Sequence, residues 1–480
     1  MNRHASLLTV LAAVLVVAGC TDERVVFRDR DLVSDVPANA QGYLGYSNAE
    51  AKLTVCGNCH VDPQNHWVNT AHADAWVTLE ANPGRQAFCE GCHTVSTEGN
   101  QAEGDGGWPV TQDERYQDVQ CESCHGPGLD HVRNPGATQP LASLGVTIGA
   151  STGCGECHSG VHHPFVEEWA ESGHGRVQET PAARPECAGC HTGQAALLAL
   201  GATDAEYVEK GSAVPLPIAC GVCHDPHAND NEGQLRYAID VPDEEQNLCM
   251  RCHHKRGLPD ETSASRGPHS PEGPLLLGDA GWVPPNMPLE PGTRIIGTHG
   301  TEANPRLCAG CHVYRFDVTD AATGDFIVSS VGHRFEATPC VDAVNGAPTG
   351  EDDCAQTARS YASCTTAGCH GSENAARSAH LVAETRLLTL AAQLEALLAQ
   401  VPATEFNPSD NRYSTAEGAR FNSQLAQKNG TEVHNPFLAE ALLLASIAQV
   451  QEDYGVSPAQ PISLESQLTR PNVMQRRSGD

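Results

Sequence analysis

The sequence predicts a mainly coil fold with short α-helices around an array of bound groups, a helical C-terminal segment and little β-structure. Three observations lead to this prediction. Only 5% of the 480 residues are aromatic and 40% are hydrophobic, while 45 Gly and 31 Pro interrupt regular elements. The 21 Cys and 23 His indicate covalent or coordinate chemistry along the chain. Leucines recur at helical spacing in the C-terminal part.

The N-terminus has the features of an export signal. Arg3 precedes an apolar stretch at residues 7–18 that ends in small residues, so residues 1–19 are predicted to be a signal peptide. The closing sequence Val-Ala-Gly-Cys resembles a bacterial lipobox, which would make Cys20 the first mature residue, acylated on its sulfur. The alternative is an ordinary signal peptide that contains a cysteine. Residues 20–51 are polar and lack periodicity, as expected of a tether.

Charge and hydropathy exclude two classes of protein. The formal net charge of −31 would repel phosphate backbones, so we expect no nucleic-acid partner. The N-terminal run alone approaches membrane length, which excludes a polytopic membrane protein. Thr21 rather than Asp follows the lipobox cysteine, and by resemblance to lipoprotein sorting this favours the outer membrane or cell surface over the inner membrane. The predicted product is therefore an exported, membrane-anchored lipoprotein.

The pattern Cys-x-x-Cys-His is repeated along the body of the chain. Its eight copies are Cys56/Cys59/His60, Cys89/Cys92/His93, Cys121/Cys124/His125, Cys154/Cys157/His158, Cys187/Cys190/His191, Cys220/Cys223/His224, Cys249/Cys252/His253 and Cys308/Cys311/His312. A ninth copy, Cys364/Cys369/His370, has four residues between its cysteines. Two thiols one turn apart can each add to a haem vinyl group, and the following histidine reaches the iron. The sequence therefore predicts nine haem c groups, eight at regular motifs and one at the wider motif.

Other uses of paired cysteines explain the pattern less well. Structural zinc takes such pairs in sets of four ligands and gives no reason for a histidine after every second cysteine. Thioredoxin-like sites lack this histidine, and a disulfide scaffold would not repeat one pattern along the chain. The first six motifs begin at 56, 89, 121, 154, 187 and 220, a period close to ankyrin and tetratricopeptide repeats. The intervening sequence is rich in Gly and Pro and contains neither helical signature, so the period belongs to haem spacing.

A second set of histidines is available for the other side of each iron. Nine motif histidines and His4 leave thirteen of the 23 for other uses. The candidates for this distal ligand are His72, His131, His163, His174, His227, His269, His299, His333, His380 and His434. His66, His162 and His254 are explained equally well as surface or hydrogen-bonded residues. An iron held by two imidazoles has no open position, so it exchanges electrons without binding substrate.

Three segments carry a resemblance to multihaem c-type cytochromes, namely residues 121–131, 220–227 and 419–436. The superfamily they resemble includes cytochrome c554, pentahaem nitrite reductase and octahaem oxidoreductases. The resemblance implies that His131 and His434 are distal ligands and that the third segment caps the haem array. This chain departs from the enzyme members because none of its motifs ends in Lys and because it has nine motifs instead of five or eight.

The predicted domain order follows from these patterns. Residues 52–372 form the multihaem domain, and residues 373–455 form a helical part that packs on the haems. Residues 456–480 are expected to be disordered. Cys340 and Cys354 stand outside any motif in a loop rich in Gly, Pro, Asp and Asn. In an oxidising compartment we expect a disulfide between these two cysteines.

Two helices are predicted in the C-terminal part. The second begins with Asn435 as N-cap and Pro436 at its first position, and Gly455 ends it. The first is marked by a leucine stripe whose members are Leu387, Leu390, Leu394, Leu397 and Leu398. Such stripes are most simply the core between packed helices.

These observations predict an exported, lipid-anchored cytochrome with nine haems that carries electrons along bis-histidine irons to or from the cell surface. No catalytic residue is predicted, and the expected partners are other redox proteins and the membrane, reached through the lipid anchor. A spare histidine that ligates a haem of a neighbouring subunit would produce a homo-oligomer or filament. The alternative is a multihaem oxidoreductase that acts on nitrogen or sulfur oxyanions through one five-coordinate haem.

Overall fold

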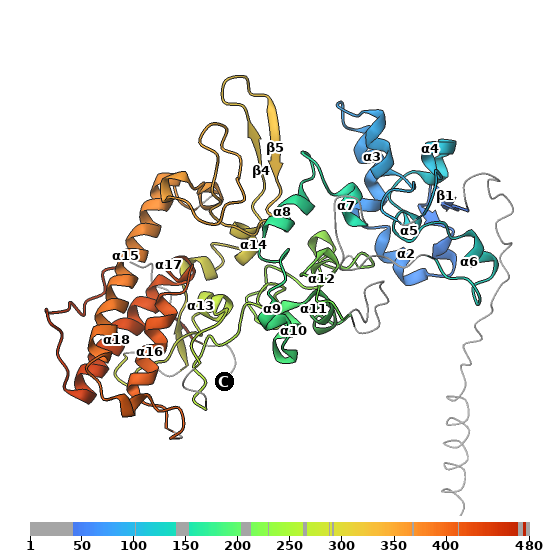
Figure 1. Cartoon of the computed structure of the whole chain (residues 1–480). Helices are drawn as coiled ribbons and strands as arrows, with labels where there is room; N and C mark the ends of the chain where they lie inside the picture. Colours follow the sequence, from blue (N-terminus) through green and yellow to red (C-terminus); the bar gives the residue numbers. More distant parts are fainter. Residues whose placement is uncertain are drawn as a thin grey trace, which may run out of the picture. The chain divides into compact units, whose positions relative to one another are not determined.

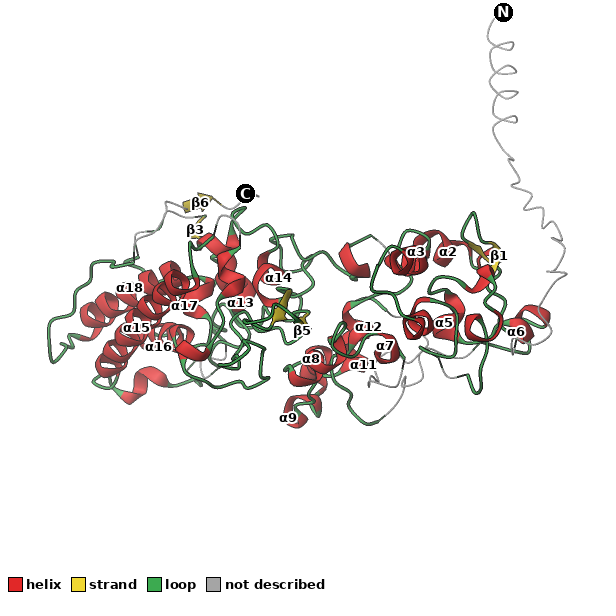
Figure 2. Ribbon diagram, turned by 90° about the horizontal axis from the view of Figure 1, so that it is seen from above, coloured by secondary structure: helices red, strands yellow, loops and turns green. Residues whose placement is uncertain are grey.

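The computed structural model describes most of the chain beyond the predicted signal peptide. The described residues are 42–468, except 101, 141–152, 203–212, 229, 263–265, 288, 290–291, 367–368 and 411, together with 474–476. The signal peptide and Cys20 therefore lie outside the described residues. Figures 1 and 2 show short helices joined by long loops, with longer helices in the C-terminal part. The predicted fold class is confirmed, because strands form only small two-stranded sheets in the described part of the chain.

The first part of the chain carries one small antiparallel sheet and several short helices. Its elements are β1 (Tyr46–Asn48), β2 (Leu53–Thr54), α2 (Val61–Trp67), α3 (Ala75–Glu80), α4 (Trp108–Thr111), α5 (Cys121–His125) and α6 (Leu129–Arg133), with 3₁₀ turns η1 (Cys56–Asn58), η2 (Ala71–Asp74), η3 (Ala87–His93) and η4 (Glu114–Tyr116). A cluster around Tyr43, Trp76, Trp108 and Tyr116 forms its apolar core.

The folded body begins earlier than the predicted tether allows. Tyr43 is fully buried. The N–H groups of Leu44 and Gly45 each donate to Oε2 of Glu122 at 2.8 Å. Glu122 is itself buried and also accepts from the N–H of Gly128 at 2.8 Å. A buried carboxylate needs such donors, and the segment that supplies them is held in place. The prediction that the tether extends to residue 51 is therefore wrong for residues 42–51.

The middle of the chain is built from short helices around a second apolar cluster. The elements are α7 (Cys154–Cys157), α8 (Phe165–Glu171), α9 (Glu179–Ala182), α10 (Pro185–His191), α11 (Gly193–Ala199), α12 (Cys220–Cys223) and η5 (Glu232–Gln234). Trp169 of α8 packs with Leu197 of α11, Val222 of α12 and Leu248. These contacts are local, and most of the remaining residues lie in loops between motifs.

The following part combines helices with a β-hairpin and a disulfide. Its elements are α13 (Glu272–Leu277), β3 (Thr293–Ile295), η6 (Thr298–Gly300), α14 (Leu307–His312), β4 (Phe316–Thr319), β5 (Phe326–Ser330), η7 (Gln356–Ala358) and η8 (Ala362–Thr365). Strands β4 and β5 pair antiparallel. Cys340 and Cys354 form a disulfide with their Cα atoms 6.1 Å apart.

The C-terminal part is a packed set of helices, visible together in Figures 1 and 2. The elements are α15 (Glu373–Leu398), η9 (Ala403–Phe406), α16 (Thr415–Ala426), α17 (Thr431–His434) and α18 (Pro436–Tyr454). The predicted leucine stripe lies on α15, and α18 begins after Asn435, whose side chain accepts from the N–H of Leu438. Sequence analysis did not identify α16, although Ser414 and Glu417 form a capping box at its start. Within the described residues, none of the helices combines the length and the apolarity needed to cross a membrane.

Part of the predicted disordered tail is held against the helices. Buried Glu440 of α18 accepts from the hydroxyl of Ser466 at 2.6 Å and from the N–H of Gln467 at 3.0 Å. Further along, strand β6 (Met474–Arg476) pairs with β3. The prediction of disorder from residue 456 onward therefore does not hold for these described residues, because a buried carboxylate and a free strand edge order them.

Candidate haem sites

Histidine rings face one another in pairs within the described structure. Eight such pairs have ring centroids 6.0–6.4 Å apart, and each pair includes one motif histidine. With the motif histidine first, they are His60 with His131, His125 with His227, His158 with His72, His191 with His269, His224 with His333, His253 with His174, His312 with His434 and His370 with His299. Every partner comes from the set that the sequence offered as distal ligands.

This spacing fits one metal ion between each pair of rings. A metal–imidazole nitrogen bond of about 2 Å, plus about 1.1 Å from that nitrogen to the ring centre on each side, places two ring centres about 6.2 Å apart. Directly packed aromatic rings cover a wider range of centroid distances, about 4.5–7 Å. All eight pairs instead lie at 6.0–6.4 Å, and each joins one motif histidine to one candidate distal ligand. The residues therefore fit a haem iron with two axial imidazoles.

The motifs close in the same way at the backbone. The N–H of the motif histidine donates to the carbonyl of the first cysteine, for example from His158 to Cys154 at 2.9 Å and from His224 to Cys220 at 2.8 Å. The wider ninth motif makes the corresponding bond from His370 to Cys364 at 3.0 Å. One such turn brings the imidazole next to the cysteines, as attachment of a haem and ligation of its iron both require. The two extra residues of the ninth motif do not change this closure.

Four of the paired rings, and that of His93, are oriented by a hydrogen bond from the nitrogen that would not ligate iron. The Nδ1 atoms of five histidines lie 2.6–2.8 Å from backbone carbonyl oxygens. The contacts are His93 to Ala75, His131 to Thr138, His224 to Gly233, His299 to Val433 and His312 to Phe335. A ligating histidine normally donates its other ring N–H in this way, which fixes its tautomer and its orientation. Nε2 is thereby left for the metal.

Burial keeps several of these imidazoles uncharged. Desolvation, together with the charges of neighbouring histidines, lowers the pKa of His158, His174 and His434 to about 4. A neutral imidazole is the form that binds a metal ion. The rings are therefore in the ligating state at neutral pH.

Three predicted site histidines, His93, His163 and His380, lie outside these eight pairs. His93 has no facing ring at this spacing among the described residues; its Nδ1 contacts the carbonyl of Ala75, and its charge, after burial, lowers the pKa of His163. His380 instead shares a hydrogen bond with the Tyr361 hydroxyl at 2.7 Å and another with Glu432 at 3.1 Å. Both ring nitrogens of His380 are thus engaged by protein groups, which leaves neither for an iron.

The histidines that sequence analysis set aside make ordinary protein contacts. His66 Nδ1 lies 2.9 Å from the carbonyl oxygen of His227, and His254 Nδ1 lies 2.7 Å from that of Met250. His162 stacks on Phe326, with ring centroids 4.7 Å apart. These side chains contribute to packing and loop structure.

Cysteines of different motifs lie next to one another. In five pairs, a thiol of one motif and burial together raise the pKa of a thiol of another motif. The pairs, with the thiol of raised pKa first, are Cys56 with Cys121, Cys157 with Cys92, Cys220 with Cys154, Cys252 with Cys190 and Cys308 with Cys249. Attachment points from different motifs are therefore neighbours in space.

The motif cysteines differ in their exposure to solvent. Four of the eighteen are exposed, and the others are partly buried; the exposed ones are Cys59, Cys124, Cys154 and Cys369. Cys59, like Cys124 and Cys369, also lies outside the five thiol pairs, so the structure does not enclose these three attachment points. The N–H of Cys59 still closes the motif turn by donating to the carbonyl of Cys56 at 3.1 Å. Haem attachment at Cys59 therefore stays a prediction from its place in the motif, because its surroundings do not confirm it.

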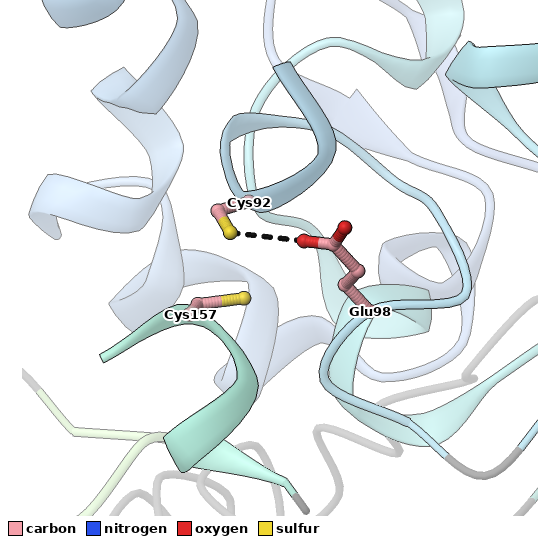
Figure 3. Close-up of side chains that lie close together, drawn as sticks. All are labelled: Cys92, Glu98 and Cys157. Carbon is pink, nitrogen blue, oxygen red and sulfur yellow. Dashed lines mark hydrogen bonds between the residues drawn. The ribbon is translucent and has the colours of Figure 1, made fainter. Parts of the chain in front are cut away.

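One of the thiol pairs also resembles a small metal site. Figure 3 shows Cys92, Glu98 and Cys157, whose ligand atoms all lie within 4.8 Å of one another. The Cys92 thiol donates to the Glu98 carboxylate at 2.9 Å. Both sulfurs belong to Cys-x-x-Cys-His motifs, and a thioether has no thiolate to offer a metal ion. The cluster is better explained as two adjacent haem attachment points.

A continuous cavity of about 3310 Å³ runs through the part of the structure that holds the later motifs. Its lining includes motif residues such as Cys220, His224 and His312 and their partners His333 and His434. Ordinary ligand pockets measure about 300–1,000 Å³. A space of this size, lined by paired histidines and cysteines, is suited to several large flat groups.

Comparisons with known proteins agree with this geometry. The family model for cytochrome c554 and c-prime matches residues 55–126, and a model for the doubled CXXCH motif matches residues 215–257. No curated protein sequence gives a significant match. The crystal structure of the outer cell wall cytochrome OcwA is similar in fold, with a TM-score of 0.51 at 17% identity, over 85% of this chain and 100% of that chain. The motifs, the opposed imidazoles and the matching family models together identify this chain as a multihaem c-type cytochrome.

Proposed function

We propose that this cytochrome is an exported, lipid-anchored electron carrier that holds nine haem c groups and exchanges electrons at or beyond the cell surface. The observation that carries the proposal is the set of eight opposed imidazole pairs. Haem iron between two imidazoles cycles between ferric and ferrous states and has no open position for a substrate. The paired arrangement therefore supports electron transfer more than catalysis.

The chain's own residues have three tasks in this proposal. The motif cysteines attach the groups, and the proximity of Cys56 and Cys121 places attachment points of the first and third motifs side by side, as electron transfer requires. The paired histidines ligate the irons, and the carbonyls that accept from Nδ1 fix the ring planes. For the iron at His93 we propose His163 as the second ligand, and we propose no iron for His380.

The proposed location rests on the N-terminal sequence and on the related fold. Cys20 follows a signal-like segment and is proposed to carry the lipid, and residues 52–372 and 373–455 are proposed to form the haem domain and its helical companion. The structure similar in fold is named an outer cell wall cytochrome. A cell-surface site would make other redox proteins or extracellular acceptors the partners.

A haem count and a spin-state measurement on one purified sample test the proposed function. The pyridine haemochrome assay is expected to give nine haems per chain, and electron paramagnetic resonance (EPR) of the oxidised protein is expected to show low-spin ferric iron alone. A high-spin signal near one per chain, with a spectral shift on addition of cyanide or nitrite, would contradict the carrier proposal. That result would favour the multihaem oxidoreductase instead.

The lipid anchor is tested separately. The mature protein is expected to partition into detergent, and a Cys20→Ser variant is expected to be released to the aqueous phase with its haem content unchanged. Equal partitioning of the two proteins would rule out the anchor without affecting the haem proposal.

A further inference from the structure

Residues 331–335, which we call the bridging segment, connect axial histidines of different motifs. His333 of this segment faces the motif histidine His224, with ring centroids 6.4 Å apart. Two residues later, the Phe335 ring makes a T-shaped contact with His174, with ring centroids 4.6 Å apart and an interplanar angle of 84°. His174 is the ring that faces His253. The segment therefore supplies one axial ring and packs an aromatic side chain against another.

The same segment also orients a ring at a third motif. The carbonyl oxygen of Phe335 accepts a hydrogen bond from Nδ1 of His312 at 2.7 Å. His312 faces His434 from the C-terminal helices, with ring centroids 6.2 Å apart. Phe335 thus contacts axial ligands of two different motifs, one through its side chain and one through its backbone. Its ring is also 5.5 Å from that of His333.

Helix α8 packs against the bridging segment. Phe165, its first residue, makes T-shaped ring contacts with His333 and with the motif histidine His158, with centroids 4.8 Å and 5.5 Å apart. One turn later, the carboxylate of Glu168 accepts from the N–H groups of Val331 at 3.0 Å and of His333 at 2.7 Å. The helix therefore binds the bridging segment and touches a fourth motif.

Glu168 has no contact with solvent and is neutralised by one cation. Its exposed fraction is 0%, and Nη1 of Arg334 donates to it at 2.8 Å. Arg334 also donates through Nε to the more exposed Glu171 at 2.6 Å. Removing one partner of a buried ion pair is costly because it leaves an uncompensated charge, so this pair holds the segment in one conformation.

The backbone of the bridging segment is in a conformation that few residues adopt freely. Phe335 has φ of 58°, the left-handed region that disfavours a bulky side chain. At Gly332, with φ of 77°, a Cβ atom would lie 2.5 Å from the carbonyl carbon of Val313. Such conformations persist only where surrounding contacts determine them, and they concentrate at functional positions. Here the determining contacts are the Glu168 carboxylate and the axial rings.

We propose that Glu168 and Phe335 are positioning residues that set the axial imidazoles of three motifs as one unit: His333 opposite His224, His174 opposite His253, and His312 opposite His434. This inference rests on the proposed function, because it requires a haem at each of these pairs. Outer contacts of a ligating histidine tune its metal site, and one rigid segment that makes such contacts at three pairs tunes them together. A change in the segment is therefore felt at neighbouring irons simultaneously.

Two variants and one matched control test this proposal in the full-length haem-loaded protein. Glu168→Gln removes the charge that binds Arg334 and weakens the bond to the His333 amide. Phe335→Leu removes the aromatic ring but keeps the backbone carbonyl for His312. Glu171→Gln alters the other partner of Arg334, at the exposed end of the same helix. Each protein is first required to show the haem content of the wild type.

EPR of the ferric proteins is the readout, because the g-values of low-spin iron depend on the orientation of its axial rings. Glu168→Gln is expected to shift three of the low-spin signals, Phe335→Leu two of them, and Glu171→Gln none. A redox titration of the same samples should show the same number of altered components. Where Glu168→Gln lowers haem content, Phe335→Leu decides the question.

The proposal is overturned if Glu168→Gln or Phe335→Leu shifts a single signal, or if the two change no more signals than Glu171→Gln. It is also overturned if either variant changes all signals equally, which would indicate general loosening. A wild-type protein that lacks these low-spin signals would instead contradict the proposed function, so the two failures are distinguishable.

Discussion

Residues 42–372 and the helices after residue 373 are stabilised by different means. In the helical part, side chains such as Leu390, Leu394 and Ile447 are completely buried against one another. In the motif part, a small apolar cluster around Trp169 borders a cavity of about 3310 Å³ that is lined by histidines and cysteines. A second small cluster, around Trp76, packs apart from this cavity. The difference teaches that a chain with few aromatic residues can leave much of its interior to attached groups and concentrate its largest side-chain core in one region.

The two regions meet at a short stretch that belongs to both. The Asn435 side chain caps α18 and donates to the carbonyls of Leu275 at 2.9 Å and Ile295 at 2.8 Å. The residue before it, His434, faces His312 of α14. The helical core therefore presents one axial ligand to the motif region and is fixed to it at the same point.

The largest expected effect comes from withholding haem. Protein made without covalent haem attachment should lose protection from hydrogen exchange in the part of the motif region that lines the cavity, because the side chains do not fill this space. Helices α15, α16 and α18 should remain protected, since their apolar core is made of side chains. Hydrogen exchange measured by mass spectrometry checks this. Equal protection of the motif region with and without haem would contradict the claim that this region depends on haem for its stability.

A second prediction concerns the histidine that the helical part contributes. His434→Ala should open one coordination position and add one high-spin ferric signal in EPR, because His434 is the ring facing His312. The matched variant His380→Ala should leave every iron low-spin, since His380 bonds Tyr361 and Glu432 instead. A high-spin signal from His380→Ala would mean that the axial pairing at the C-terminal motif is wrong.

A third prediction isolates the helical core. Leu390→Ala should lower the free energy of unfolding of the helical part by about 2–5 kcal/mol, because it removes a completely buried side chain. The control Leu388→Ala, at a position 46% exposed on the same helix, should change it by less than about 0.5 kcal/mol. Urea unfolding followed by circular dichroism measures both. The low-spin EPR signals of the motif region should be unchanged in each variant.

The smallest effect concerns the tail and depends on pH. Burial opposes the charged form of Glu440, but hydrogen bonds from Ser466, the Gln467 amide and Arg386 outweigh it and lower the pKa of this carboxyl. The stabilisation is therefore present above the ordinary Glu pKa of 4.5 and is lost as the pH falls through the lower folded-state value.

Hydrogen exchange at residues 465–468 should accordingly rise in acid while that of α18 stays low. Glu440→Gln should raise exchange in this segment already at neutral pH, at a cost of about 1–3 kcal/mol for the lost charged hydrogen bonds. If exchange of the segment were insensitive to both acid and the substitution, Glu440 would not be what holds it.

The sequence predicted what depends on local spacing. Each motif could be read directly, and the start of α18 followed from Asn435 and Pro436. The missed helix α16 also had a local signal, the capping box of Ser414 and Glu417. What joins distant segments could not be read. Nothing in the sequence near His72 indicates that its ring faces His158. The sequence around His380 looks like that of a distal ligand, yet its ring nitrogens bond Tyr361 and Glu432.

The surroundings of each cysteine are likewise a property of the fold and not of its motif. Cys59 and Cys223 occupy the same position in their motifs, yet Cys59 is exposed and Cys223 is partly buried against an apolar cluster. The spacing of a motif describes one turn of backbone, whereas the burial of a sulfur depends on segments that pack over that turn.

Buried acids were the other residues that local patterns concealed. Glu122 and Glu168 look like ordinary surface residues in the sequence, yet both are buried and bind backbone N–H groups of segments that come from far away in the chain. Their role depends on which amides reach them, which is a property of the folded chain. The left-handed backbone at Phe335 was hidden in the same way. Glycine or asparagine usually marks this conformation in a sequence, and this position holds a phenylalanine.

The order of the paired histidines along the chain has a consequence for biosynthesis. In five of the eight pairs, such as His60 with His131 and His312 with His434, the second ring lies after the motif. A chain emerges with its N-terminus first. A motif completed early must therefore wait for its partner, and an iron attached during that interval would be open to oxygen and small ligands. During this interval, the iron of such a motif needs protection from oxygen and small ligands.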